Sequence, residues 1–171
     1  KSIPSLRFNK KKNYLFSGVV FIPFEIFKKK IILKNFNNFI NNLELKSLNK
    51  LTCKIHPLNQ DSSKHKDLAV KINRIIKNNP NKFSNSCKKK SSILFGSATG
   101  VCIQALEEGI TIYHFPNNEV LDVFSEKMWP NIKVKKITHK VYEYSLKKKN
   151  KTFLVNNEKN KFDKYFLPLL K

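Results

Sequence analysis

The sequence is poor in cysteine, and the few cysteines it has are not arranged to bind metal or to form disulfides. Cys53, Cys87 and Cys102 are an odd number and contain no C-x-x-C pair. Neither a zinc knuckle nor a disulfide framework is therefore predicted. Cys53 and Cys102 stand in apolar stretches, which indicates core residues in a protein of a reducing cytoplasm.

A long apolar run is also lacking in the 171 residues. The first residue is Lys1 and residues 1–13 contain no long apolar run, so we predict no signal peptide and no transmembrane segment. The length suits one α/β domain with a real core rather than two domains. We expect a basic leader or linker over 1–13, the domain over 14–146, and a basic tail over 147–171 with a terminal helix near its end.

Arginine is scarce although the chain is strongly basic. The formal net charge is +22, yet Arg7 and Arg74 are the only arginines among 34 basic residues. Recognition of nucleic acid usually relies on the arginine fork, so this composition argues against a nucleic-acid partner. The chain is also rich in Asn, Ile and Phe, as in AT-biased genomes. We interpret the lysine runs as mainly solubilising, with peripheral contact to the anionic inner face of a membrane as a secondary role.

Apolar periodicity predicts strands that alternate with helices. The predicted strands are 14–22, 51–56, 93–95, 110–113, 132–137 and 140–146. The predicted helices are 32–43, 68–76, 101–106 and 120–128. This alternation implies crossover connections, and hence an α/β fold: a Rossmann-like, mostly parallel sheet with helices on both faces.

The turn after the strand at 93–95 consists of small and hydroxyl residues, Gly96, Ser97, Ala98, Thr99 and Gly100. Such residues let a ligand approach the backbone and leave the first N–H groups of the next helix available to an anion. The simpler alternative is that Ser97 caps the helix and Gly96 only turns the chain.

A histidine stands at the end of an earlier strand, in the dipeptide His56-Pro57. Proline ends the strand, so the imidazole is expected to project toward the crevice at the carboxyl ends of the parallel strands. There it could neutralise a phosphate or donate a proton to it. An ordinary strand-end histidine is the alternative. His114 ends another strand and is expected to face the same crevice and touch a ligand.

In combination these motifs resemble the carboxyl-terminal half of GT-B glycosyltransferases, over about 14–137. The bacterial sialyltransferases, polysialyltransferases and surface-carbohydrate biosynthesis proteins of this type carry an His-Pro motif and a later Ser/Thr motif. The stretch 54–57 looks like the first motif, and Ser97 with Thr99 looks like the second. Gln104-Ala105-Leu106 with Gly109 is similar to the Glu-Ala-Leu-x-x-Gly stretch of donor domains, with Gln104 in place of the acid.

The resemblance implies a donor-binding domain for a nucleotide-activated sugar, CMP-sialic acid or a relative, in an inverting reaction that needs no metal. His56, beside Pro57, would contact the nucleotide phosphate or act as general acid. Ser97 and Thr99, with the backbone of Gly96 and Gly100, would hold the donor phosphate or a sugar carboxylate. Lys54 would add positive charge, although a solvated lysine is an equal alternative.

One part of the family pattern is missing. The sialyltransferases place their general base in an Asp/Glu-Asp/Glu-Gly triplet of an amino-terminal acceptor domain, and no such domain or base is recognised here. The string Glu107-Glu108-Gly109 lies at a helix end and is not interpreted as that base. The chain would thus supply one half of an enzyme that acts on a glycan acceptor in surface polysaccharide synthesis.

Other candidate residues have simpler explanations. Asp61, His65 and Asp67 could be drawn as a metal cluster, but helix capping by aspartate accounts for them. Glu119 follows a turn where donor domains often contact a ribose, or it complements a helix end. The alternative function for the whole chain is a non-enzymatic basic module that binds nucleic acid or an anionic membrane surface.

Overall fold

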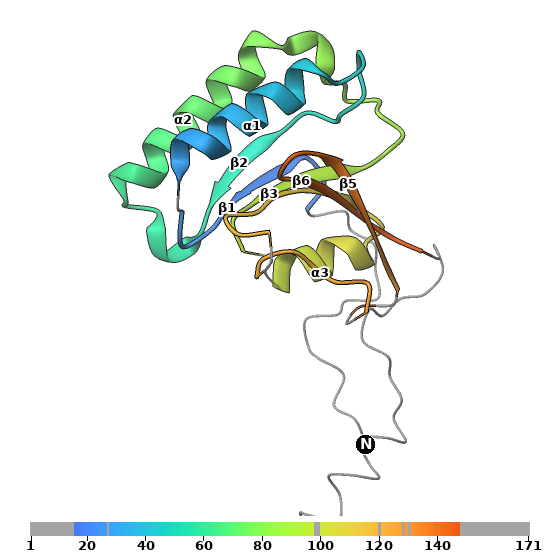
Figure 1. Ribbon diagram of the computed structural model, residues 1–171. Helices are drawn as coiled ribbons and strands as arrows, with labels where there is room; N and C mark the ends of the chain where they lie inside the picture. The colour runs from blue at the N-terminus through green and yellow to red at the C-terminus, as the bar shows by residue number, and fades with distance from the viewer. Residues whose placement is uncertain are drawn as a thin grey trace, which may run out of the picture.

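The computed structural model of the protein describes residues 16–26, 28–97, 100–119, 121–127, 129 and 131–147. In these residues the chain forms one six-stranded sheet with three α-helices and two short 3-10 helices (Figure 1). In chain order the elements are β1 (Val19–Ile22), α1 (Lys29–Asn41), β2 (Thr52–Ile55), η1 (Pro57–Asn59), α2 (Ser63–Asn78), η2 (Pro80–Lys82), β3 (Ser91–Phe95), α3 (Gly100–Glu107), β4 (Thr111–Phe115), β5 (Ile132–Thr138) and β6 (Val141–Leu146). The predicted leader, and the predicted tail beyond Lys147, lie outside the described residues.

Four parallel strands make up the larger part of the sheet. The strand order is β2-β1-β3-β4-β6-β5, and the pairs β1–β2, β1–β3 and β3–β4 are parallel. β5 and β6 form an antiparallel hairpin, which joins the sheet through an antiparallel pair of β6 with β4. The predicted α/β fold with a mostly parallel, Rossmann-like sheet is therefore confirmed.

The helices cover both faces of the sheet, also as predicted. α1 and α2 lie together on one face and α3 lies on the other (Figure 1). Phe36 of α1 packs edge-on against Phe95 of β3 and Phe115 of β4. α2 buries Leu68 and Ile72 in the same cluster. In each helix the residues that the 3.6-residue period places on one face are those that are buried.

The positions of α1 and α2 leave part of the opposite face open. β2 and β3 flank β1 on opposite sides, so the crossovers β1–α1–β2 and β2–α2–β3 run in opposite directions along the sheet. Since both helices lie on one face, the two crossovers have opposite hands, and one departs from the right-handed rule. On the α3 side, no described helix covers β2, and its side chains Thr52 and Lys54 are exposed there.

The prediction of a helix over 120–128 is wrong. The described residues between β4 and β5 form turns and bends without a helix. Asp122 accepts hydrogen bonds from the N–H of Asn118 and from the hydroxyl of Ser97, and Glu126 accepts the N–H of Val134. These bonds tie the acidic side chains of the segment to residues outside it.

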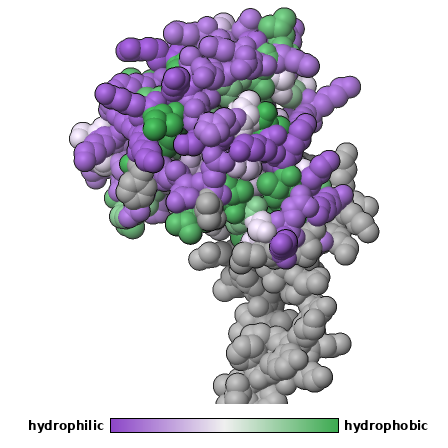
Figure 2. Space-filling model, viewed as in Figure 1, coloured by the Kyte–Doolittle hydropathy of each residue, from purple (hydrophilic) through white to green (hydrophobic). Residues whose placement is uncertain are grey.

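Hydrophilic side chains dominate the visible surface, with small separate apolar areas (Figure 2). In the part of the chain that the structure describes, no helix combines the length and the apolar character needed to cross a bilayer.

Candidate functional site

Both sequence motifs lie at the carboxyl edge of the parallel strands. β1 ends at Ile22, β2 at Ile55 and β3 at Phe95, and their parallel pairing brings these ends to one edge. After β1 the chain turns toward α1 on one face, and after β3 it turns toward α3 on the other (Figure 1). Open α/β sheets usually bind ligands where neighbouring loops diverge in this way.

A pocket of about 530 Å³ opens at this edge, against β1 and β2 on the α3 side of the sheet, where no described helix covers β2. Its walls are largely apolar and include Phe21, Leu94 and Val101, whereas Lys54 and His56 bring polar groups. This volume lies within the range of about 300–1,000 Å³ that is typical of small-molecule sites. A largely apolar pocket with a lysine and a histidine in its lining suits a ligand that has an apolar part and a charged part.

His56 lines this pocket, directly after β2. Its backbone N–H donates to the carbonyl of Ile22 at 2.9 Å, which ties the turn to β1. Its Nδ1 atom accepts a hydrogen bond from the N–H of Leu58 at 3.3 Å, as the N-cap of η1. Because Nδ1 is an acceptor, the neutral ring carries its proton on Nε2. No described residue binds Nε2, so this atom can donate to a ligand.

A set of hydrogen bonds holds Phe24 beside His56. The two rings meet edge to face, with their centroids 5.6 Å apart. The Phe24 carbonyl accepts from the side-chain amide of Asn59 and lies 3.1 Å from Nε2 of His65. Nδ1 of His65 in turn lies at hydrogen-bond distance, 2.8 Å, from the hydroxyl of Ser62. The loop after β1 is thus fastened to the start of α2, and His56 gains a fixed neighbour.

In these contacts His65 has a structural role: its ring nitrogens contact Ser62, Asn59 and the Phe24 carbonyl. Asp67 pairs with Lys29 and Lys71, and its hydrogen bonds to these lysines lower the pKa of its carboxyl group. The N-cap of α2 is Ser62, so capping by aspartate is not observed either. Among the residues that the structure describes, no three His, Cys, Asp or Glu side chains are grouped to hold a metal ion.

Lys54 and Pro57 also line the pocket, on either side of His56 in the chain. Lys54 belongs to β2, where Cys53 and Ile55 face α2 and the cluster beneath it. The period of two therefore turns Lys54 to the opposite, open face, where it is exposed. Pro57 is the first residue of η1 and ends the strand, as the sequence predicted.

Gly96 fits its position because it has no side chain. Its φ is +74°, and a Cβ atom built there would lie 2.7 Å from Cγ of Pro23. An L-residue would therefore be both strained and crowded. The Gly96 N–H donates to the carbonyl of Phe115 at 2.9 Å. The turn after β3 is thus packed tightly against the loop after β1.

The resemblance implied that Ser97, Thr99 and Gly100 hold the donor. The described residues of this set do not line the pocket. Ser97 is exposed and donates its hydroxyl proton to Asp122 at 2.8 Å, and it does not line the pocket. Thr99 lies outside the described residues. Gly100 is exposed and begins α3, while Gln104 is half-buried farther along the helix. The first turn of α3 reaches the pocket through Val101 instead.

The expectation that His114 faces the crevice is wrong. Its side chain is fully buried, with Nδ1 2.8 Å from the hydroxyl of Tyr144 and Nε2 2.5 Å from the carbonyl of Gly96. Burial lowers its pKa from the ordinary value of 6.5 to about 4. β4 lies between β3 and β6 and is buried along its whole length, so its histidine supports the Gly96 turn from below.

Glu119 is held by the β5–β6 hairpin. It accepts a hydrogen bond from the hydroxyl of Tyr142 and pairs with Lys136 at 3.1 Å. The bond from Tyr142, followed by that from Lys136, lowers the pKa of the Glu119 carboxyl group. Its contact with a ribose stays a prediction, and the helix that it was expected to complement is not formed.

Sequence reasoning missed the apolar walls of the pocket and the support of His56. Phe21 was counted in a continuous apolar strand, although its place between Val20 and Ile22 puts it on the opposite face from those two residues. The roles of Phe24 and Asn59 depend on a contact between loops 35 residues apart, which no local pattern signals.

The chain was compared with models of protein families, with curated proteins and with solved structures, and none of them matched. The fold and the pocket define the class: an α/β domain with a mostly parallel sheet and a largely apolar pocket at its carboxyl edge. A more specific function has to be inferred from the chemistry of that pocket.

Proposed function

We propose that this domain binds the nucleotide-activated sugar of a GT-B glycosyltransferase, with CMP-sialic acid or a related compound as donor. The observation that supports the proposal best is the environment of His56. His56, whose Nε2 atom has no partner among the described residues, lines a largely apolar pocket of about 530 Å³ together with Lys54. The pocket also lies at the edge of the sheet where α/β proteins bind nucleotides.

The parts of a nucleotide match the parts of this pocket. The apolar walls formed by Phe21, Leu94 and Val101 suit the faces of a base and a ribose. The phosphate would lie by His56, where Nε2–H donates a hydrogen bond and the Lys54 ammonium group supplies positive charge. The amino-terminal end of α3 is next to the same space and adds the partial positive charge of a helix start.

The reaction would be an inverting displacement at the anomeric carbon. The acceptor oxygen attacks from the face opposite the nucleotide, the bond from carbon to phosphate oxygen breaks, and its electron pair stays on the phosphate. The hydrogen bond from His56 strengthens as negative charge grows on that oxygen, which lowers the barrier. The proton of the acceptor hydroxyl goes to a base that the resemblance assigns to an amino-terminal acceptor domain. This domain would therefore bind the donor for surface polysaccharide synthesis.

The test is nucleotide binding by the 171-residue chain, measured by thermal shift and calorimetry with CMP, UDP and GDP. We expect one nucleotide to stabilise the fold, and His56→Gln to weaken its binding by about tenfold or more, as expected for loss of a charge-assisted hydrogen bond. Val101→Phe should block the pocket. His139→Gln is the matched control, because it changes an exposed histidine outside this pocket.

Two results would count against the proposal. One is the lack of a response to all three nucleotides, and the other is unchanged affinity in both His56→Gln and Val101→Phe. The alternative, a basic module for nucleic acid or an anionic membrane, has its own signature. Binding through many lysines weakens steeply as salt rises, whereas a nucleotide held by one histidine and a few neighbours should respond only weakly.

A further inference from the structure

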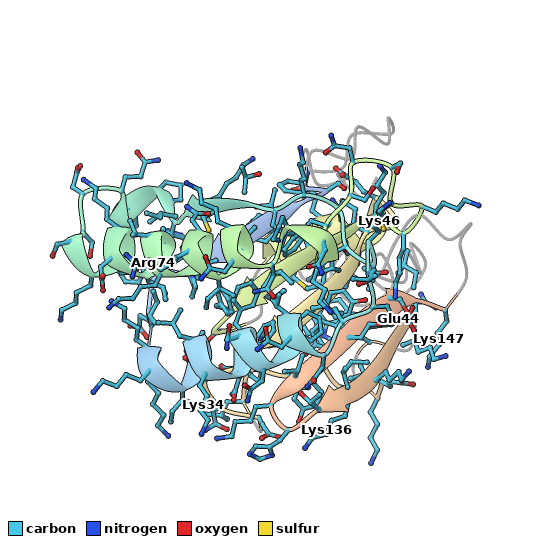
Figure 3. All side chains as sticks on the ribbon, turned by 90° about the horizontal axis from the view of Figure 1, so that it is seen from above. Lys34, Glu44, Lys46, Arg74, Lys136 and Lys147 are labelled. Atoms are coloured by element: carbon cyan, nitrogen blue, oxygen red, sulfur yellow. The ribbon has the colours of Figure 1, made fainter. Side chains whose placement is uncertain are left out.

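A second hollow lies between α1 and the turn of the β5–β6 hairpin, and it shares no lining residue with the pocket beside His56. Its volume is about 450 Å³. We call it the α1–hairpin groove, and its polar lining residues are Lys34, Asn35, Asn38, Asn42 and the turn 138–140. In Figure 3, Lys34 on α1 and Lys136 on the hairpin lie on the same side of the molecule, with Lys46 on the other.

Three side-chain amides line one wall of the groove. Asn35 and Asn38 of α1 and Asn42, the C-cap residue directly after it, are spaced by three and four residues, so they form one row. None of the three side chains has a hydrogen-bond partner among the described residues. Each amide offers two donors and one acceptor. A row of such groups matches sugar hydroxyls, which both donate and accept hydrogen bonds.

The fixed charge of the groove is positive. Lys34 and Lys140 line it, and neither forms an ion pair with a described carboxylate. No Asp or Glu is among the described lining residues. Ile31, which is 43% exposed, adds an apolar surface that suits the C–H face of a sugar ring. The lining thus favours a ligand that carries both hydroxyl groups and an acidic group.

Lys140 occupies a backbone conformation that lysine does not favour. Its φ is +61°, in the left-handed region where glycine is the residue without strain. Lys46 has a similar φ of +54° but does not line the groove. The two residues therefore form a matched pair. Replacement of either lysine by glycine removes one positive charge and relieves backbone strain, but only Lys140→Gly changes the lining of the groove.

We propose that the α1–hairpin groove binds a carboxylated saccharide, with its hydroxyl groups on the asparagine row and its carboxylate between Lys34 and Lys140. This site goes beyond the proposed donor pocket and does not depend on it, because the two hollows share no lining residue.

The probe for the experiment is a galacturonic acid tetrasaccharide, with maltotetraose as the neutral control. Binding is followed by NMR of the side-chain amide groups of Asn35, Asn38 and Asn42, which should shift with the acidic probe and not with the neutral one. Asn38→Ala and Lys140→Gly should each weaken binding about tenfold. Lys140→Gly should at the same time raise the thermal midpoint, so lost binding cannot be attributed to unfolding. Lys46→Gly should raise the midpoint and keep the affinity.

The proposal is overturned if the acidic tetrasaccharide leaves the three amides unshifted, or if maltotetraose binds equally well. It is also overturned if Lys46→Gly weakens binding as much as Lys140→Gly, because the attraction would then come from net charge alone. Tighter binding of a single-stranded oligonucleotide with the same sensitivity to Lys140→Gly would assign the groove to nucleic acid instead.

Discussion

The buried imidazole of His114 should make the fold sensitive to mild acid. Both ring nitrogens are used, one with the hydroxyl of Tyr144 and the other with the carbonyl of Gly96. Desolvation by burial is the main cause that lowers the pKa of His114 to about 4, whereas the bond to Gly96 acts in the opposite direction. An imidazole in the unfolded chain keeps its ordinary pKa of about 6.5.

The sign and the size of the effect follow from this difference. Between pH 6.5 and pH 4 the unfolded chain binds a proton at His114 that the folded protein does not bind. The free energy of unfolding therefore falls as the pH is lowered through this window and recovers as the pH rises. A shift of two to three pKa units corresponds to about 3 kcal/mol. This is a large part of the about 5–15 kcal/mol by which a typical domain is stable.

The measurement is urea unfolding at several pH values for the wild type and for His114→Gln, which removes the titrating group but keeps polar atoms. The variant is expected to be less stable at pH 7. The gap between the two proteins should narrow by about 3 kcal/mol as the pH falls from 7 to 4. His139→Gln, at an exposed turn, is the control and should run parallel to the wild type. A gap that stays constant with pH would refute the reasoning.

Two further predictions concern the packing around the site. Gly96→Ala should cost about 2–3 kcal/mol, because its Cβ would collide with Pro23, whereas Gly109→Ala, at a similar φ but in open space, should cost only about 1 kcal/mol. Urea unfolding of both variants checks this, and equal losses would contradict it. Burial raises the pKa of Cys53 to about 12 and raises that of Cys102 as well, so both thiols should resist iodoacetamide at pH 8 until the protein is unfolded. Mass spectrometry of the native protein would contradict this if Cys102 were modified rapidly.

The sequence predicted the fold well where one local pattern decides the structure. The four parallel strands and the helices at 29–41, 63–78 and 100–107 follow from apolar spacing, because each element buries the face that its period defines. The prediction of a helix over 120–128 was wrong because an apolar residue of this segment packs against aromatic side chains without forming a helix. Phe124 packs against Trp129 and Tyr144 without a helix, and Asp122 is used by Ser97. Tyr144 and Ser97 are distant from this segment in the sequence, and Trp129 comes after it. The pattern within 120–128 therefore does not reveal these contacts.

The site was predicted only in part, for the same reason. His56 stands where the strand end and Pro57 place it, and it lines a pocket as expected. The burial of His114 depends on β6, which pairs with β4 after a connection that the alternation of strands and helices does not reveal. The contact of Ser97 with Asp122 spans 25 residues. Local sequence patterns thus located the strand ends, whereas contacts between distant segments decided which side chains line the pocket.

The arrangement of the helices also explains why the two hollows differ in chemistry. Because α1 and α2 share one face of the sheet, part of the other face is left with Phe21 and Leu94 as the wall of a largely apolar pocket. The outer side of α1 keeps its asparagine row at the surface, where the lysine-bearing hairpin turn meets it. One hollow suits a flat base with a phosphate beside it, and the other suits hydroxyl groups with a carboxylate. Since no residue lines both, the two binding hypotheses can succeed or fail independently.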